Sequence, residues 1–181
     1  MKLSLFEFPL PLYFMMNVNK IKTVIAFVLI SSISCTSQAG FTHYESVAKE
    51  GLSPRPVIFK IPSSALKENP QNLFIRIRNN TEYEFSNIFL IATLKAGDQQ
   101  VLQDTLEYAM AAPDGSWLGI GFTELKESKL WWKKGIKIPT ERPVQIEISQ
   151  AIRVNGSATG VTELKGIVSV GISIEDQEDP K

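Results

Sequence analysis

The only cysteine of the chain, Cys35, stands where a thiol can be acylated. It comes shortly after an apolar run, Val24 to Ile30, that follows two lysines, which is the layout of a secretory signal peptide. The small residue Ser34 suits a lipoprotein signal peptidase that cuts directly before a cysteine. A lone thiol cannot form a disulfide within the chain, and lipid attachment would explain why an exported protein has a single cysteine. The sequence therefore predicts removal of residues 1–34 and a lipid on Cys35.

Two points in this segment stay open from the sequence. An ordinary signal peptidase could use Ser37 and Ala39, cut before Gly40 and discard the cysteine. A start at Met16 would give a signal peptide of ordinary proportions, so the true start lies at Met1 or at Met16. The apolar run itself is shorter than the roughly 20 residues that a membrane-spanning helix needs, which favours a cleaved segment.

The residues that could carry catalysis are few. His43 is the only histidine, and it precedes the first expected strand, so the sequence predicts a solvent-exposed linker residue. A zinc site needs three or four His, Cys or carboxylate ligands, which one histidine and one lipid-bearing cysteine do not supply. We therefore expect no metal and no cofactor.

Paired carboxylates could still hydrolyse glycosidic bonds if two of them faced each other across a cleft. The candidates are Asp104, Glu107, Asp114 and Glu124, and nothing in the sequence brings two of them together. Ordinary surface carboxylates, with Asp114 forming a turn, are the favoured interpretation. The sequence predicts a protein that is not an enzyme and has no small-molecule substrate.

The charge balance argues against a nucleic-acid-binding protein. The chain has 19 basic and 19 acidic residues, and without the segment before Cys35 there remain 16 basic and 18 acidic residues. No cluster of basic residues marks a nucleic-acid surface.

The rest of the sequence alternates between short strands and turns. Apolar and polar residues alternate over 73–78, 100–108 and 144–148, a mostly apolar strand is expected over 87–95, and a last strand over 166–174. Residues 63–68 and 123–132 could be helical, although a strand or loop is as good a description of the second. Strands without intervening helices predict an all-β fold, an antiparallel β-sandwich resembling a jelly roll. The expected organisation is a signal segment (1–34), a lipidated cysteine with a flexible tether (35–56), a single sandwich domain (57–176) and a polar tail (177–181).

Four residues of this domain are candidates for an interaction surface. Arg76 and Arg78 project from the same face of one expected strand. Adjacent aromatic residues on a strand point to opposite faces, so one of Trp131 and Trp132 should lie in the core and the other should be exposed. The alternatives are that the arginines solvate the sheet or pair with acidic residues, and that the exposed tryptophan covers a sheet edge.

Several motifs follow one another along nearly the whole chain after Cys35, at residues 76–80, 83–90, 104–106, 114–121, 150–153 and 166–174. In their order they resemble the gliding-motility-associated lipoproteins of the GldH type, found in Bacteroidetes. Cys35 also stands where that family has its lipidated cysteine.

The resemblance implies a periplasm-facing lipoprotein, anchored in a membrane of the cell envelope, that is needed for gliding motility. It also implies an association with the type IX secretion machinery, in which the protein would support or stabilise other gliding or secretion lipoproteins. It implies no enzymatic activity. The alternative is a glycan-binding lipoprotein, in which an exposed tryptophan beside polar groups in a groove stacks on sugar rings.

Overall fold

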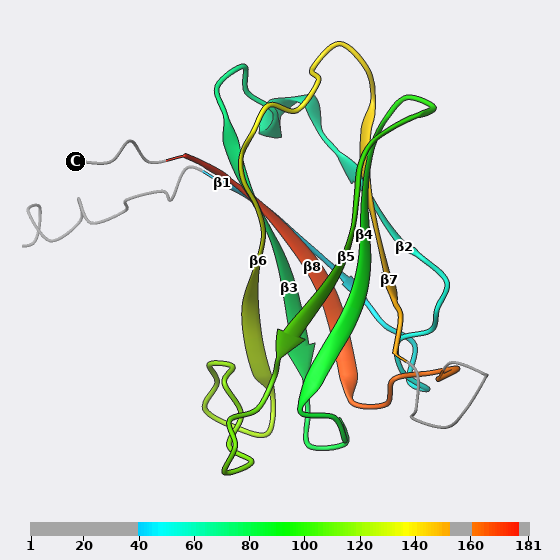
Figure 1. Ribbon diagram of the computed structural model, residues 1–181, viewed down its shortest axis with the longest axis vertical. Coiled ribbons are helices and arrows are strands. Elements are labelled where there is room, and N and C mark those ends of the chain that lie inside the picture. Colours follow the sequence, from blue (N-terminus) through cyan, green and yellow to red (C-terminus); the bar gives the residue numbers. More distant parts are fainter. Residues whose placement is uncertain (1–39, 153–160, 178–181) are drawn as a thin grey trace, which may run out of the picture. The chain divides into compact units, whose positions relative to one another are not determined.

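The computed structural model describes residues 40–152 and 161–177, and this part of the chain is built from β-strands (Figure 1). A single short 3₁₀ turn, η2 (Ser63–Ala65), lies among them. The strands are β1 (Gly40–Ser46), β2 (Val57–Ile61), β3 (Gln71–Asn79), β4 (Asn87–Ala96), β5 (Gln99–Ala109), β6 (Lys126–Ile136), β7 (Val144–Gln150) and β8 (Ile167–Asp176).

The strands form two antiparallel four-stranded sheets that pack face to face. One has the order β1-β8-β3-β6 and the other the order β2-β7-β4-β5. Along the chain every connection between consecutive strands crosses from one sheet to the other, except that between β4 and β5, and this is the order of an eight-stranded jelly roll. The predicted all-β sandwich is confirmed.

The core lies between the sheets and follows from the alternation of the strands. On β3, Leu73, Ile75 and Ile77 are buried, whereas Arg76 and Arg78 project to the other face. β4 lies between β7 and β5, as its apolar sequence suggests. The most deeply buried large side chains include Phe59, Leu73, Ile75, Ile77, Ile88, Leu90, Leu94, Met110, Ile146 and Ile148.

The predicted flexible tether over 35–56 is wrong from Gly40 onwards, and the sandwich does not begin at residue 57. Residues 40–46 form β1, which pairs with β8 from Gly40 opposite Glu175 to Ser46 opposite Ser169. Leu52 is buried and bridges to Leu164. β1 is an edge strand with few apolar residues, so its sequence looks like a linker, but it covers the flank of β8.

A β-bulge alters the expected face of Val168. The sequence places it with Val170, Ile172 and Ile174, which are all buried, but Val168 is 40% exposed. Asn79 pairs with Ile167 while Arg78 pairs with Ser169, so Val168 is an extra residue on β8. An extra residue shifts the alternation, and Ile167 takes the core position instead.

The segments with an open assignment are also settled. Residues 126–136 form β6, so the expected range 123–132 ends in a strand and not a helix. Within 63–68 only η2 is helical.

Several expectations lie outside the described residues: the signal segment, Cys35, and the tail beyond Gln177. No helix within residues 40–152 and 161–177 is long and apolar enough to cross a membrane.

Gly166 permits a close approach of two chain segments before β8. Its φ is +80°, and a Cβ there would lie 2.1 Å from the backbone nitrogen of Tyr83. Its carbonyl accepts a hydrogen bond from the Asn80 N–H at 2.8 Å. Because the obstacle is backbone, no rotamer change can relieve it.

We expect Gly166→Ala to lower the free energy of unfolding by about 2–4 kcal/mol, combining left-handed strain with overpacking. The matched control is Gly115→Ala, where φ is +84° but nothing lies within 4 Å. It should show the strain alone, about 1 kcal/mol. Urea unfolding of both variants measures the difference, and equal losses would contradict the close packing at Gly166.

Candidate functional site

The outer face of the β1-β8-β3-β6 sheet brings together three of the four residues that the sequence suggests for an interaction surface, Arg76, Arg78 and Trp131. The strand register aligns them in rows across the sheet, because directly opposed residues share a face. We call this surface the Arg76 face; its members are Thr42 and Tyr44 on β1, Gly171, Ser173 and Glu175 on β8, Phe74, Arg76 and Arg78 on β3, and Glu127, Lys129 and Trp131 on β6.

Glu127 is the centre of the polar network on this face. Its Oε1 accepts hydrogen bonds from the Tyr44 hydroxyl at 2.7 Å and from Arg76 Nη1 at 2.8 Å. Its Oε2 accepts one from Arg78 Nε at 2.8 Å. One carboxylate on the edge strand β6 therefore binds side chains from β3 and from β1, the opposite edge of the sheet.

Two opposing effects set the pKa of Glu127. Desolvation by burial would raise it, but the hydrogen bonds from Tyr44, Arg78 and Arg76 outweigh burial and hold the pKa below its ordinary value. The network acts on Tyr44 in the other direction, since burial and then the hydrogen bond to Glu127 raise the pKa of its phenol. Glu127 is thus ionised, and Tyr44 protonated, at neutral pH.

Gly171 makes room for Tyr44. A Cβ at residue 171 would lie 2.5 Å from the Tyr44 ring, so the ring lies across β8 where that strand has no side chain. Arg78 stacks on the ring, with its guanidinium carbon 3.9 Å from the ring centre, in a cation–π contact. The arginine is therefore fixed both by Glu127 and by an aromatic surface.

Beyond Arg76 the face becomes aromatic. The rings of Phe74 and Trp131 meet edge to face, with centroids 4.3 Å apart, and Lys129 Nζ lies 4.0 Å from the centre of the Phe74 ring. Lys129 also pairs with Glu175 at 2.7 Å. These contacts bury Phe74, although it points outwards, and leave Trp131 47% exposed.

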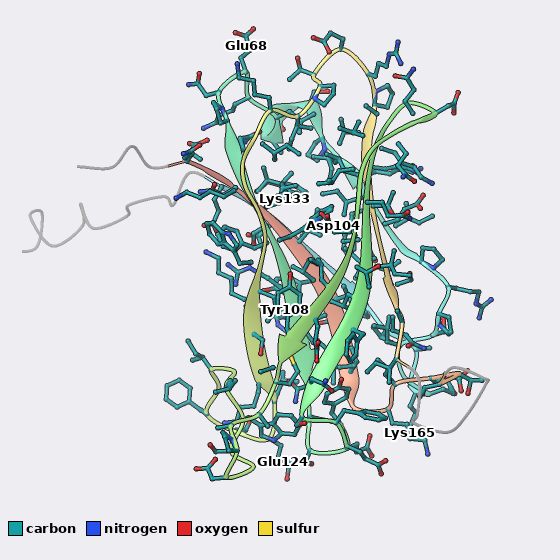
Figure 2. All side chains as sticks on the ribbon, in the orientation of Figure 1. Glu68, Asp104, Tyr108, Glu124, Lys133 and Lys165 are labelled. Atoms are coloured by element: carbon teal, nitrogen blue, oxygen red, sulfur yellow. The ribbon has the colours of Figure 1, made fainter. Side chains whose placement is uncertain are left out.

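Trp132 belongs to the core, and a bulge in β6 explains its contacts. Leu73 pairs with Lys133 and Phe74 with Trp131, so Trp132 is the extra residue. Trp132 is 5% exposed, and its indole N–H donates to Asp104 Oδ2 on β5 at 2.9 Å. Lys133 Nζ lies 3.2 Å from the same oxygen, and Figure 2 shows Asp104 and Lys133 pointing toward each other from the two sheets.

Tyr108 makes a second link between these edge strands. Its hydroxyl donates to the Trp131 carbonyl at 2.6 Å. Burial, and then the nearby charge of Asp104, raise the pKa of Tyr108 to about 12, so the donor stays protonated. The polar groups on β5 thus join the edges of the two sheets.

Of the four predicted surface residues, Arg76, Arg78 and Trp131 share one face, and Trp132 does not belong to it. The expectation of one core and one exposed tryptophan agrees with this geometry. Reasoning from the sequence missed Tyr44 and Glu127. Tyr44 fell in the expected tether, and Glu127 fell in a segment without a clear strand assignment. Two arginines on one face of a strand are expected to pair with acidic residues on the neighbouring strands, and this was the signal in the sequence that could have pointed to Glu127.

The other candidate residues have structural contacts. His43 is not a linker residue, because it lies on β1, half-exposed, with Nε2 3.0 Å from Glu45 Oε1. Asp114 accepts hydrogen bonds from the side chain and N–H of Ser116, which lower its pKa. Glu107 accepts a hydrogen bond from Asn87 at 2.8 Å and lies on the opposite face of β5 from Asp104.

Glu124 is exposed in the loop after β5. Within residues 40–152 and 161–177, no three His, Cys, Asp or Glu side chains gather as a metal site requires.

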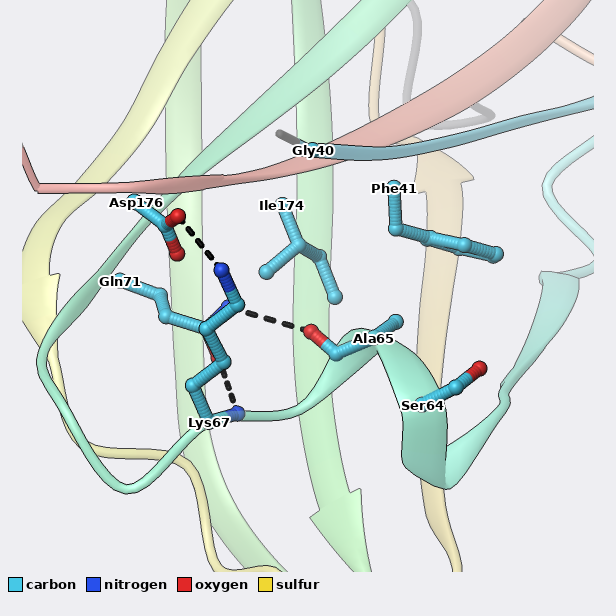
Figure 3. A pocket seen from close by; sticks show the side chains of 8 residues that line it. All are labelled: Gly40, Phe41, Ser64, Ala65, Lys67, Gln71, Ile174 and Asp176. Carbon is cyan, nitrogen blue, oxygen red and sulfur yellow. Dashed lines mark hydrogen bonds and ion pairs between the residues drawn. The ribbon is translucent and has the colours of Figure 1, made fainter. Parts of the chain in front are cut away.

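A hollow of about 330 Å³ lies where the described chain begins, between β1, β8 and the β2–β3 connection (Figure 3). Its charged groups satisfy each other, since Lys67 Nζ lies 2.6 Å from Asp176 Oδ2. Gln71 donates to the Ala65 carbonyl and accepts from the Lys67 N–H. These bonds tie the end of β8 to the β2–β3 connection and leave no unpaired charge in the hollow for a ligand to meet.

Known proteins match the part of the chain that forms the sandwich. A family model described as GldH lipoprotein matches residues 41–174, from β1 into β8. A gliding motility lipoprotein GldH homolog of Christiangramia forsetii is 40% identical over 156 residues, 86% of this chain and 95% of the relative. The gliding motility lipoprotein GldH of Flavobacterium johnsoniae is 36% identical over 155 residues, 86% of this chain and 96% of the relative.

The chain belongs to the GldH lipoprotein family. Membership makes it a gliding-motility lipoprotein of the cell envelope, anchored to a membrane by lipid. The family is one of motility lipoproteins and is not known as an enzyme family.

Solved structures offer only distant similarity. The VP2 subviral particle of infectious bursal disease virus has a TM-score of 0.31 and 12% identity, covering 76% of this chain and 33% of the viral chain. The particle of the Gx strain of the same virus has a TM-score of 0.27 and 14% identity, covering 81% and 33%. At these scores neither likeness bears on function.

We expect Glu127→Gln to lower the free energy of unfolding at pH 7 by about 1–3 kcal/mol, because the hydrogen bonds from Arg76 and Arg78 lose their charged acceptor. A depressed pKa contributes stability that is present above the ordinary value of 4.5 and is lost as the pH falls through the folded-state value. The gap between wild type and variant should therefore narrow below pH 4.5.

Denaturant unfolding at several pH values tests this, with Glu124→Gln as the control on an exposed carboxylate. A gap that stayed constant down to pH 3 would contradict the role of Glu127.

Proposed function

We propose that this protein is a lipid-anchored, periplasm-facing scaffold that supports gliding motility and the associated type IX secretion machinery by stabilising other envelope proteins. The observation that carries the proposal is the family match over residues 41–174, together with two relatives named gliding motility lipoprotein that are covered almost completely. Retention in the periplasm is supported by the absence of an acidic run in the sequence directly after Cys35.

The anchor in this proposal is a lipid on Cys35. A buried methylene contributes about 0.8 kcal/mol, so two or three acyl chains hold a protein firmly on a bilayer. Four residues separate Cys35 from Gly40, where β1 begins. The proposed anchor would therefore join a folded strand almost directly.

The Arg76 face supports a binding role over a catalytic one. Its arginines and its central carboxylate are paired with one another, so no group on it is poised as an acid, base or nucleophile. Fixed side chains form a surface that a partner can meet without ordering it first. We propose this face, with Arg76, Arg78 and the exposed Trp131, as a contact surface for an envelope protein.

The glycan-binding alternative is weaker. It rests on Trp131 alone, because Trp132 is buried. The edge-to-face contact with Phe74 occupies part of the Trp131 ring, and Trp131 is not among the residues that line the hollow beside Arg76. Of the carboxylates considered for glycoside hydrolysis, Asp104, Glu107 and Asp114 are held in the structural contacts described above, and Glu124 is exposed in a loop, which favours a protein without enzymatic activity.

The anchor is tested by the mass of the N-terminal peptide from purified membranes. We expect a wild-type peptide that begins at Cys35 and carries acyl mass, and loss of the protein from membranes in Cys35→Ala. An unmodified N-terminus at Gly40 would refute the lipid on Cys35 and point to a released protein.

The function is tested by deletion and complementation. Deletion should stop colony spreading and reduce the secretion of surface proteins, and the wild-type gene should restore both. We expect Trp131→Ala combined with Arg78→Gln to reduce spreading while membrane levels stay close to wild type. The matched control is Ile58→Ala, which changes a side chain of similar exposure (50% against 47%) on the other sheet.

Normal spreading of the deletion strain would refute the motility role. Normal spreading of the Trp131 and Arg78 variant alone would refute only the contact surface.

A further inference from the structure

The connection between β5 and β6, residues 110–125, holds apolar side chains out in solvent. Phe122 is fully exposed, Ile120 is 86% exposed and Leu118 is 56% exposed. Leu125 beside them is also exposed. Single exposed apolar residues are common, but a contiguous group marks an interaction site.

Hydrogen bonds fix this connection in place. The Ile120 N–H donates to the Glu127 carbonyl at 2.8 Å, and the Glu127 N–H donates back at 2.9 Å. The Leu118 N–H donates to the Met110 carbonyl at 2.9 Å, and Lys126 Nζ donates to the Gly121 carbonyl at 2.6 Å. The apolar side chains are thus presented from a backbone that is tied to β6 and to Met110, the residue that follows β5.

A hollow of about 550 Å³ lies beside these side chains. Leu118 and Ile120 line it from the connection, and Arg76 and Lys129 line it from the Arg76 face; the remaining lining residues are Ala109, Glu127, Ser128 and Leu130. The hollow therefore has an apolar wall and a charged wall, which is the lining that a peptide segment with mixed side chains requires.

The edge of β6 opens on the same hollow. β6 is the last strand of its sheet, and both main-chain groups of Glu127 bond to Ile120 on the side away from β3. Main-chain groups two residues apart on a strand point the same way, so the N–H and C=O of Lys129 are directed away from β3 as well. An extended segment could continue the pairing that Ile120 begins.

We propose that this surface (Leu118, Ile120 and Phe122, with the hollow beside them) docks a different protein of the cell envelope. The partner inserts an extended segment whose apolar side chains cover Leu118 and Ile120 and whose main chain pairs with β6 at Lys129. The inference deepens the proposed function, since it rests on the protein being a membrane-anchored scaffold.

Charge argues against a lipid surface as the occupant. The charged residues within 110–125 are Asp114 and Glu124, and both are acidic. The basic side chains that line the hollow are already paired, Arg76 with Glu127 and Lys129 with Glu175. Anionic lipid headgroups attract basic segments and repel acidic ones. A bilayer surface would also leave the hollow, with its charged wall, unfilled.

The position of the proposed anchor also argues against a lipid surface as the occupant. Gly40 lies opposite Glu175, which lies opposite Asn72, whereas Lys126 lies opposite Asn79. Seven residues of β3 separate these two levels, which is about 23 Å at 3.3 Å per residue. Figure 1 shows the β5–β6 connection at the far end of the sheet from the start of β1. The proposed anchor lies within about 18 Å of Gly40 by chain length. It would therefore hold the Gly40 end of the sheet nearer the bilayer than the β5–β6 connection.

Thiol accessibility tests the proposal in the lipidated full-length protein. Because Cys35 is the only native cysteine, Thr123→Cys adds one free thiol beside Phe122 and keeps every apolar side chain. A membrane-impermeant maleimide is applied to opened native envelope membranes and to purified protein in vesicles of phosphatidylethanolamine and phosphatidylglycerol. We expect labelling to be more than about tenfold slower in native membranes, because an interface excludes solvent. Gln100→Cys, at the other end of β5, should label equally in both.

A second substitution links the protection to the apolar side chains. Ile120→Ser, added to Thr123→Cys, should raise the labelling rate in native membranes to that in vesicles. The matched control Ile58→Ser removes another exposed isoleucine and should leave the protection unchanged.

Fast labelling in both preparations would overturn the proposal, since nothing would cover the surface. Slow labelling in both would also overturn it, because the bilayer or a second copy of the chain would then be the occupant. Failure of the anchor is seen separately, as protein missing from the washed membranes before any labelling.

Discussion

The ionised carboxylate of Glu127 is the interaction on which the outer face of the β1-β8-β3-β6 sheet depends. Two guanidinium groups next to each other on β3 repel, and each needs an acceptor when it is partly buried. Glu127 supplies oxygens to both and still accepts the hydroxyl of Tyr44 from the opposite edge strand. A single anion therefore holds together side chains from three strands.

The two sheets depend on a similar arrangement at their edges. Exposed strand edges are a liability, because they can pair with other chains. Asp104 and Tyr108 on β5 bond to Trp132, Lys133 and the Trp131 carbonyl on β6, so polar contacts close one side of the sandwich. The bulge at Trp132 makes this possible, since it places the indole in the core without turning Lys133 out of reach. The exposed apolar side chains of the β5–β6 connection lie at the other end of this side, beside the part of β6 around Glu127 and Lys129.

The sequence was informative where strands alternate regularly and less so where they do not. Leu73, Ile75 and Ile77 follow the period of two, and β3, β4, β5, β7 and most of β8 could be found from it. β1 could not, because an edge strand needs few apolar residues and its partner strand is more than 120 residues away. The bulges at Val168 and Trp132 are set by the neighbouring strands, and a pattern within one strand does not reveal them. For the same reason Arg76, Arg78 and Trp131 could be named as surface residues, but Glu127 and Tyr44, which organise them, required the sheet.

The position of β1 determines how the domain would carry mechanical load. β1 is the first folded element after the proposed anchor, and it pairs with β8 along its full length, from Gly40 to Ser46. A pull between the membrane and the distant end of the sandwich acts along this strand, so its inter-strand hydrogen bonds are loaded together in shear and do not open one after another. A strand loaded in this way resists detachment far better than one peeled from its end. With the proposed anchor and partner, this strand arrangement would transmit tension from a bilayer into the partner without first unravelling at the point of attachment.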